Sequence, residues 1–344
     1  MLIEAFLVIM FLTGCTVPTV TLTSTPRVLP TATPTLLVAP AQITEPKITR
    51  TSLPSSLPLE FVWRITGGQN PLSRPIGVAI DMERNVYVMD AGNSRVQKFD
   101  QNGKFLLMWG SKGEGDGQFN ITMPDEGSVA VDADGNVYVG DANNYRIEKF
   151  DSSGNFLAKW GSNGQGNDQF VEIADIAIDS QKNVYVSDFQ NDTIQKFDNK
   201  GNFLLGWGSP GSAPGQFSGA GSIVFDSQGN VLVAEVETGR IQKFDNSGKP
   251  LAHYFLPQVA NVFIVPYAIT LDGQGNMYIS DNPAYRIIKF DSNMNLLAVW
   301  GTKGNGPGQF MNMHTIRVDE NGNVYVTDST NNCIQKFRQP TFHP

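Results

Sequence analysis

From residue 59 onward the chain repeats one unit of about 47 residues. NVYVMDAGNSRVQKFDQNGKFLLMWG at 85–110 returns as NVYVGDANNYRIEKFDSSGNFLAKWG at 136–161, and further copies begin at 183, 230, 276 and 323. An acidic residue ends the first apolar run of each copy, and these acids are 51, 47, 47, 46 and 47 residues apart: Asp90, Asp141, Asp188, Glu235, Asp281 and Asp328. A fixed period of this length indicates one domain built from stacked copies of a single structural unit.

Each unit divides into four short strands. In the second copy the first strand ends at Asp132, and the other three cover 137–139, 146–150 and 156–160. Gly, Asp and Asn between them supply the left-handed backbone that tight hairpins require. Six such units predict an all-β fold, a six-bladed β-propeller of four-stranded antiparallel blades.

The aromatic residues predict how the ring closes. Ten places after the repeated Phe stand Trp109, Trp160, Trp207, Tyr254 and Trp300, whereas Phe337 lies too near the last residue for such a partner. Trp63, in Leu59-Glu60-Phe61-Val62-Trp63, is the remaining Trp, and we expect it to take the missing place in this column. We therefore expect the N-terminal strand to complete blade 6, which removes the unpaired edges at the seam.

These motifs resemble the NHL-repeat family of six-bladed propellers. The resemblance rests on Gly-Asn-Val-Tyr-Val-x-Asp, on Arg-Ile-Gln-Lys-Phe-Asp, and on Gly-Gln-Phe at 117–119, 215–217 and 308–310. It covers residues 59–338 and is specific for fold. It says little about function, because such propellers include binding scaffolds, sensors and a few enzymes.

The N-terminal part has a different composition. Residues 1–15 carry a short apolar run followed by Leu12-Thr13-Gly14-Cys15. This pattern resembles a bacterial lipoprotein signal peptide, with Cys15 as the lipidation site. It departs from that pattern in having Glu4 and no Lys or Arg. Residues 16–58 hold 11 Thr, 8 Pro, 4 Ser and no Gly, so we expect a disordered, semi-stiff stalk. The propeller domain is then 59–344, and an ordinary hydrophobic N-terminus is the alternative reading of the leader.

The charge balance argues against a nucleic-acid partner. Without the leader and the stalk the domain holds 22 Lys and Arg against 31 Asp and Glu, a net charge of -9. The repeated lysines occur once per unit, from Lys98 to Lys336, and so give no concentrated basic patch.

Most repeated polar residues are expected to be structural. The acid column is followed by Arg95, Arg146, Arg240 and Arg286, which predicts a cross-strand ion pair within each of those blades, while Thr193 and Cys333 replace the Arg in blades 3 and 6. Cys333 is expected to be a free, half-buried thiol. Asp132-Ala133-Asp134-Gly135-Asn136 faintly resembles a calcium loop but fits a hairpin turn better.

Departures from the repeat on the innermost strands point to a binding site. Asp175 stands four places before the Asp that ends the first strand, where the other units have Gly, Ser, Ala or Thr. One place earlier in the repeat, blades 5 and 6 have Tyr267 and His314. Arg317 stands two places before the Asp that ends the first strand of blade 6, where three other units have Ala. We expect Asp175, Tyr267, His314 and Arg317 at the channel mouth, binding an anionic or polar ligand. The alternative is an internal Asp175–Arg317 ion pair, and side-chain alternation leaves open whether His314 and Arg317 both point inward.

Catalysis is the second hypothesis. Propeller enzymes such as peptidylglycine alpha-amidating lyase and streptogramin lyase use metal centres, but this chain has only His253, His314 and His343, too few for a His-rich zinc site. No hydrolase, zinc-protease or phosphate-binding motif occurs. We therefore predict no cofactor, no metal site and no catalytic residue.

The sequence as a whole favours a non-enzymatic scaffold that binds a protein, peptide, glycan or small ligand. It is expected to be a monomer, lipid-anchored on the extracytoplasmic side of a bacterial membrane. The irregular segment from His253 to Tyr267 is a second candidate surface, with Phe255, Leu256 and Phe263 as expected exposed residues.

Overall fold

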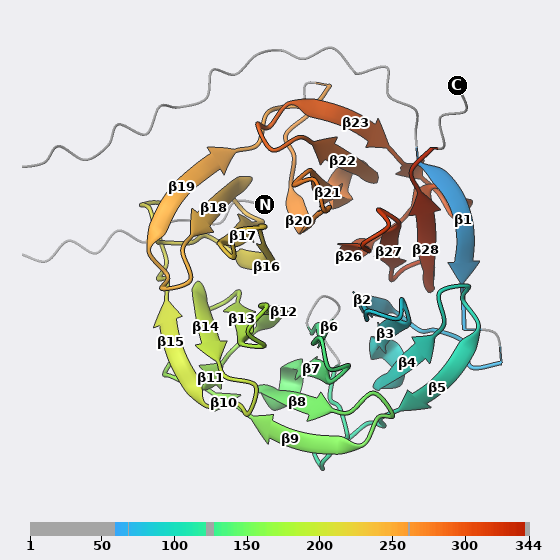
Figure 1. Cartoon of the computed structure of the whole chain (residues 1–344), viewed down its shortest axis with the longest axis vertical. Helices are drawn as coiled ribbons and strands as arrows, with labels where there is room; N and C mark the ends of the chain where they lie inside the picture. The colour runs from blue at the N-terminus through green and yellow to red at the C-terminus, as the bar shows by residue number, and fades with distance from the viewer. Residues whose placement is uncertain (1–58, 68, 122–126, 261, 341–344) are drawn as a thin grey trace, which may run out of the picture. The chain divides into compact units, whose positions relative to one another are not determined.

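The structure, a computed structural model, describes residues 59–67, 69–121, 127–260 and 262–340, which all fall in one compact unit, Glu45–Pro344. Six four-stranded antiparallel sheets surround a central axis (Figure 1). The predicted all-β, six-bladed propeller is therefore confirmed. Cys15, the stalk at 16–58 and His343 lie outside the described residues, and within the described part no helix is long and apolar enough to cross a bilayer.

Each blade uses its four strands in order from the axis outward. The innermost strands are β2 (Pro75–Ile80), β6 (Val129–Val131), β12 (Ile173–Ile178), β16 (Ala220–Phe225), β20 (Pro266–Leu271) and β26 (Met313–Val318). The second strands are β3 (Val86–Asp90), β7 (Val137–Asp141), β13 (Val184–Asp188), β17 (Val231–Glu235), β21 (Met277–Asp281) and β27 (Val324–Asp328). The third strands are β4 (Arg95–Phe99), β8 (Arg146–Phe150), β14 (Thr193–Phe197), β18 (Arg240–Phe244), β22 (Arg286–Phe290) and β28 (Cys333–Arg338). The outer strands are β5 (Phe105–Trp109), β9 (Phe156–Trp160), β15 (Phe203–Trp207), β19 (Pro250–Phe255), β23 (Leu296–Trp300) and, for blade 6, β1 (Glu60–Ile65).

Short elements occupy some of the connections. They are the two-residue strands β10 (Ser162–Asn163), β11 (Gln169–Phe170), β24 (Thr302–Lys303) and β25 (Gln309–Phe310), and the 3-10 turns η1 (Ala91–Asn93), η2 (Ala142–Asn144) and η3 (Asn282–Ala284).

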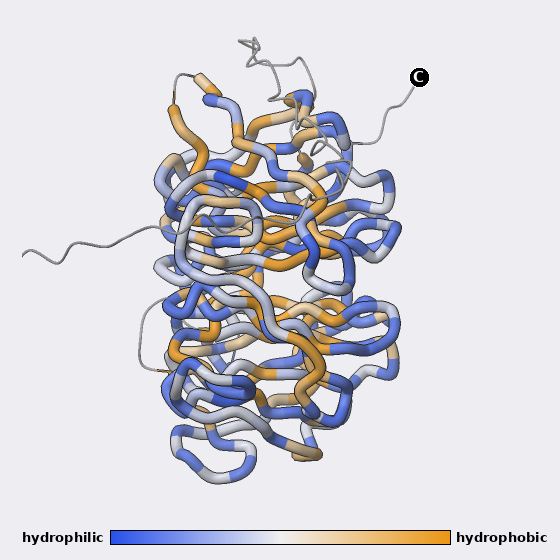
Figure 2. The backbone as a smooth tube through the Cα atoms, turned by 90° about the vertical axis from the view of Figure 1, so that its left-hand side faces the viewer, coloured by the Kyte–Doolittle hydropathy of each residue, from blue (hydrophilic) through white to orange (hydrophobic). Residues whose placement is uncertain are grey.

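The core lies between neighbouring blades. The second strands are apolar throughout because both faces of each sheet are covered: four read Val-Tyr-Val, β17 reads Val-Leu-Val and β21 reads Met-Tyr-Ile. Val88, Val139 and Val186 are fully buried. One cluster joins Met89 of blade 1 to Val139 of blade 2, and the hydrophobic segments run through the interior of the side view (Figure 2). Each such buried aliphatic side chain stabilises the fold by about 1.5–3 kcal/mol.

The Asp at the end of each innermost strand organises the hairpin that follows. Asp132 Oδ1 accepts the backbone N–H groups of Asp134 and Asn136 at 2.9 Å each, and Oδ2 accepts the Tyr138 hydroxyl at 3.0 Å. The carboxylate is thus used by the turn itself, which confirms the hairpin interpretation of this loop.

The predicted acid–arginine pairs form in four blades. The Arg Nε atoms lie 2.6–2.9 Å from the acids, which are all fully buried, in the pairs Arg95–Asp90, Arg146–Asp141, Arg240–Glu235 and Arg286–Asp281. In blades 3 and 6 the acids instead accept from Asn191 and Asn331, each at 2.7 Å, and from backbone N–H groups. Every acid of this column is therefore satisfied, as buried charges must be.

Arg64 of β1 takes over part of the missing arginine's role in blade 6. In blades 2 and 4 the Arg of the third strand donates to a loop carbonyl, Arg146 to Glu114 and Arg240 to Ser212. In blade 6, where Cys333 holds that position, Arg64 donates to the equivalent carbonyl of Asn305 at 2.6 Å. Cys333 itself is fully buried rather than half-buried, and burial raises the pKa of its thiol to about 11.

The N-terminal strand closes the ring as predicted, but in a different register. β1 pairs with β28 so that Phe61 lies opposite Phe337 and Ile65 lies opposite Ile334. At the position of Ile65, blades 1, 2, 3 and 5 have a Trp and blade 4 has Tyr254. The bulge between Phe61 and Trp63 matches the bulge in the other outer hairpins, which puts Trp63 two residues short of the Trp column. The expected equivalence of Trp63 with the other Trp residues was therefore wrong in register, although its ring still packs on Tyr325 at 5.8 Å.

Candidate functional site

The innermost strands line a channel along the propeller axis (Figure 1), and the channel contains two hollows. The first halves of these strands line a cavity of about 280 Å³, which we call the axial cavity. The second halves line a hollow of about 270 Å³. Because these strands all start from the same face of the ring, the two hollows lie at opposite ends of the channel.

All four residues that the sequence singled out line the axial cavity. Asp175 comes from β12, Tyr267 from β20, and His314 and Arg317 from β26. Blades 3, 5 and 6 thus bring them together, and their placement at the channel agrees with the expectation. A bound ligand remains a prediction.

Asp175 of blade 3 is buried and accepts hydrogen bonds from three other blades. Its Oδ1 accepts from the Ser128 hydroxyl of blade 2 at 2.8 Å and from Arg317 Nη2 of blade 6 at 2.9 Å. Its Oδ2 accepts from the Ser222 hydroxyl and the Ile223 N–H of blade 4, each at 3.0 Å. The carboxylate therefore links the innermost strands across the channel, and its charge is well compensated.

Arg317 reaches Asp175 because the other blades have smaller side chains at its position in the repeat. The other blades place Ala79, Ala130, Ala177, Val224 and Thr270 at this position, and these small side chains leave the axis open. The Arg317 side chain crosses that space and also donates from Nη1 to the Ile316 carbonyl at 3.1 Å. The internal ion pair considered as an alternative therefore exists, and it forms the floor of the axial cavity.

His314 is held on the wall of the axial cavity by polar neighbours. Its Nε2 lies 3.1 Å from Asn312 Nδ2 and 3.0 Å from Ser329 Oγ. Since an amide nitrogen can only donate, Nε2 accepts, and the ring proton is assigned to Nδ1 in the neutral form. The Tyr267 ring packs edge-to-face on the imidazole with centroids 5.4 Å apart.

Sequence reasoning missed several lining residues. Glu172 and Phe189 of blade 3 and Val236 of blade 4 also line the axial cavity. Phe189 and Val236 directly follow the acid column, where blades 1 and 2 have Ala91 and Ala142. The change from Ala to a larger side chain at this position of the repeat is the feature of the sequence that indicates these two residues.

The described residues contain no group of three or more His, Cys, Asp or Glu side chains arranged to hold a metal ion. His253 lies on the outer strand β19, far from His314 in the fold, since β19 is the edge of blade 4. The polar groups of the axial cavity can donate and accept hydrogen bonds, and Tyr267 and Phe189 add aromatic faces.

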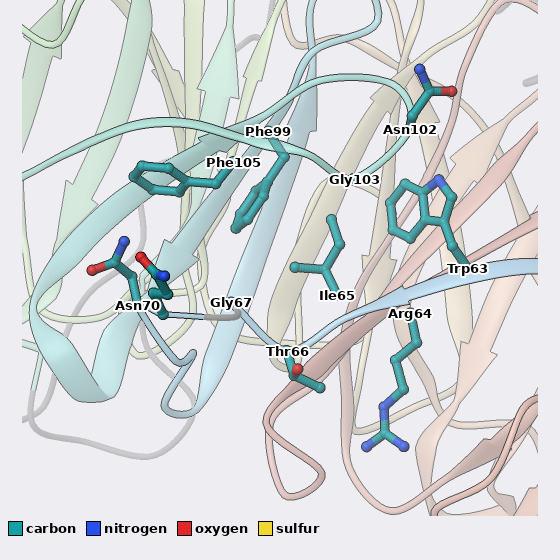
Figure 3. A pocket seen from close by; sticks show the side chains of 11 residues that line it. Trp63, Arg64, Ile65, Thr66, Gly67, Asn70, Phe99, Asn102, Gly103 and Phe105 are labelled. Atoms are coloured by element: carbon teal, nitrogen blue, oxygen red, sulfur yellow. The ribbon is translucent and has the colours of Figure 1, made fainter.

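A further cavity, of about 360 Å³, lies at the seam between blades 6 and 1. Figure 3 shows Trp63 and Ile65 on one side of β1 and Arg64 on the other. Phe99, Phe105 and Gly103 of blade 1 complete the wall. Its residues are those of the ring closure, so we interpret it as a packing gap of the seam.

The irregular segment from His253 to Tyr267 is partly exposed. Phe255 and Phe263 are 55% and 73% exposed, whereas Leu256 packs on the hydrophobic cluster between blades 4 and 5. The expectation of an exposed Leu256 was therefore wrong, because this side chain fills the inter-blade core.

The similarity of this sequence to known protein families agrees with the six-bladed fold. A sequence profile of the NHL repeat matches residues 72–99 and 310–337, and one described as a 6-bladed beta-propeller matches residues 128–204. NHL repeat-containing protein 3 from Mus musculus is 35% identical over 101 residues, which cover 27% of this chain and 27% of that protein. The chain thus spans about a quarter of the length of this relative.

Two solved structures extend the likeness over most of the ring. Virginiamycin B lyase from Staphylococcus aureus has a TM-score of 0.56 at 15% identity, over 80% of this chain and 98% of that one. A gluconolactonase from Xanthomonas campestris has a TM-score of 0.57 at 14% identity, over 78% and 87% of the two chains. At such identities the likeness concerns the fold alone. The chain is a six-bladed β-propeller that carries NHL repeats.

Proposed function

We propose that this protein is a membrane-tethered, extracytoplasmic binding module that takes a small polar ligand of little net charge in the axial cavity. The observation that carries the proposal is the convergence of Asp175, Tyr267, His314 and Arg317 from three blades on one cavity. A concave site with a few convergent polar groups among apolar walls is the usual form of a ligand site.

The ion pair on the floor decides the charge of this ligand. Arg317 lies 2.9 Å from Asp175, so its charge is already balanced on the side that faces the axial cavity. An anion bound there would compete with Asp175, whereas hydroxyl and amide groups can bond Tyr267, His314 and Thr315 without displacing it. We therefore narrow the expected ligand from anionic or polar to polar and nearly neutral, such as a sugar or a short peptide.

Membrane tethering rests on the sequence, through the motif that ends at Cys15. A diacyl or triacyl anchor at Cys15 would hold the protein on a membrane, since a single chain binds only marginally. The stalk at 16–58 would separate the propeller from the lipid surface.

The test is ligand-observed NMR with a panel of neutral disaccharides and capped dipeptides. We expect at least one compound to bind, and Tyr267→Ala to weaken that binding at least tenfold, because the aromatic wall is lost. Tyr254→Ala on the outer strand β19 is the matched control and leaves binding unchanged. Turnover of virginiamycin B or gluconolactone by the wild-type protein, or binding that does not respond to Tyr267→Ala, would contradict the proposal.

A further inference from the structure

The hollow at the other end of the channel has a composition unlike that of the axial cavity. Its rim is formed by the residue that precedes the turn Asp in each blade, and we call this ring the apolar collar: Ile80, Val131, Ile178, Phe225, Leu271 and Val318. Every member is half-buried, so each side chain packs between blades and still meets the hollow. The collar therefore offers a continuous aliphatic and aromatic surface around the axis.

One cation lies at the bottom of this hollow. Arg317 is the single charged residue of the hollow's described lining, and Thr270 is the single other polar one. Arg317 lines both hollows, whereas Asp175 lines only the axial cavity. The guanidinium thus separates the two compartments, with Asp175 on one side and the collar on the other.

Arg317 has donors left for a ligand. Of its five N–H groups, those that bond described residues go to Asp175 Oδ1 and to the Ile316 carbonyl. Its side chain keeps 18% exposure. Asp175 is itself saturated by Ser128, Ser222 and two backbone N–H groups, so it does not need every donor of the guanidinium.

We propose that the apolar collar binds a small aliphatic carboxylate, with the carboxylate on Arg317 and the hydrocarbon chain within the collar. A carboxylate forms charge-assisted hydrogen bonds with a guanidinium that bonds an acid on its other side, as Arg146 does between Asp141 and Glu148 in blade 2. An ammonium group would be repelled, and an uncharged hydrocarbon would leave the guanidinium donors without a partner. This site is separate from the axial cavity and does not depend on the function proposed there.

The size of the hollow limits the chain length of the ligand. Each methylene that enters the collar tightens binding roughly three- to fourfold, until the hollow of about 270 Å³ is full. Affinity is thus expected to rise from butanoate to hexanoate and then to level off.

The experiment is ligand-observed NMR of the full-length protein with butanoate, hexanoate, octanoate, hexanamide and hexylamine. N-acetyl-leucine is included to distinguish a peptide carboxyl end from a free aliphatic acid. We expect hexanoate to bind at least tenfold more tightly than hexanamide, hexylamine not to bind, and N-acetyl-leucine to bind more weakly than hexanoate. Tighter binding of N-acetyl-leucine would overturn the assignment to a free aliphatic acid.

Two variants test the location of this site. Arg317→Met removes the cation and should weaken hexanoate at least tenfold, while Ala177→Leu fills the hollow and should do the same with the Asp175–Arg317 pair intact. Ala177→Leu keeps the test decisive should Arg317→Met fail to fold. Tyr267→Phe in the axial cavity is the control and leaves hexanoate binding unchanged. Hexanoate binding that survives Ala177→Leu in a folded protein, or no hexanoate binding at millimolar concentration, would overturn the proposal.

Discussion

Blade 2 carries a buried acid where four of the other blades carry an amide and blade 5 carries Ile288. Glu148 is fully buried and takes the place of Gln97, Gln195, Gln242 and Gln335. Burial raises its pKa to about 7, although Arg146 and the Gly117 N–H favour the carboxylate. In blades 1 and 4 the corresponding amide donates to the acid column, Gln97 to Asp90 at 2.8 Å and Gln242 to Glu235 at 2.9 Å. The fold therefore accommodates Gln at this position without rearrangement.

Glu148→Gln is expected to stabilise the protein above neutral pH. Because the folded pKa is raised from the ordinary value of 4.5 to about 7, the wild-type Glu148 lowers the stability progressively between these two pH values, and the whole loss is present above pH 7. We expect the variant to gain about 1–3 kcal/mol in free energy of unfolding at pH 8, with a smaller gain at pH 5. Thermal unfolding at the two pH values measures this. The mirror variant Gln242→Glu should destabilise at pH 8, and a pH-independent effect of both would refute the assignment.

The four residues of the axial cavity show which parts of a candidate site a repeated sequence can predict. Asp175, Tyr267, His314 and Arg317 were found because they break columns that the repeat defines, and the structure places all four on one cavity. The direct Asp175–Arg317 contact could be foreseen only as an alternative. The contact forms because the long Arg317 side chain extends across the axis, where three other blades have only an Ala at the same position. The spacing of the strands in the sequence does not predict this distance.

The N-terminal strand β1 is the element that completes the ring. Its pairing with β28 could be predicted from the missing outer strand of blade 6. Its register could not be taken from Trp alone, because the pattern that matches is Phe61-Val62-Trp63-Arg64-Ile65 against Phe156-Leu157-Ala158-Lys159-Trp160. The Phe that opens both segments, Phe61 and Phe156, was the better guide.

Arg64→Ala should weaken the closure of the ring. Its guanidinium donates hydrogen bonds to the carbonyls of Asn305 and Asn331 at 2.6 and 3.1 Å. The loop at Asn305 has no arginine from the third strand to bond it, because Cys333 stands at that position. Loss of these charged hydrogen bonds is expected to cost about 1.5–3 kcal/mol, measured by urea unfolding.

A matched control lies on the neighbouring strand. Arg338 pairs with Glu60 at 2.7 Å, but its side chain is 57% exposed, so Arg338→Ala should change stability by no more than about 0.5 kcal/mol. Equal losses in the two variants would show that Arg64 has no special part in the seam.

At the scale of the whole molecule, the repeated residues build the ring and the exceptions are placed at its axis. The acid column and the turn Asp residues recur in every blade with local hydrogen-bond partners, and the Val-Tyr-Val strand recurs in four of the six blades. The Asp175–Arg317 ion pair joins blade 3 to blade 6 across the channel and divides it into two chemically different ends. The ring thus has one polar and one apolar hollow on a common axis.

Cys15→Ser tests the proposed anchor. The thiol is the acylation site in the lipoprotein interpretation, so its replacement should move the protein from the membrane fraction to the soluble fraction. Fractionation followed by immunoblotting measures this, with Cys333→Ser as the control because Cys333 is buried in blade 6. Continued membrane association of the Cys15→Ser protein would contradict a lipid anchor.

The central claim is that the axial cavity binds a ligand through its own side chains and is not a metal-dependent active site. Elemental analysis of the purified Cys15→Ser protein tests this most directly. We expect no divalent metal in stoichiometric amount, either in this protein or in its His314→Ala variant. One metal ion per chain that is lost in the His314→Ala variant would contradict it and would make the axial cavity a metal centre.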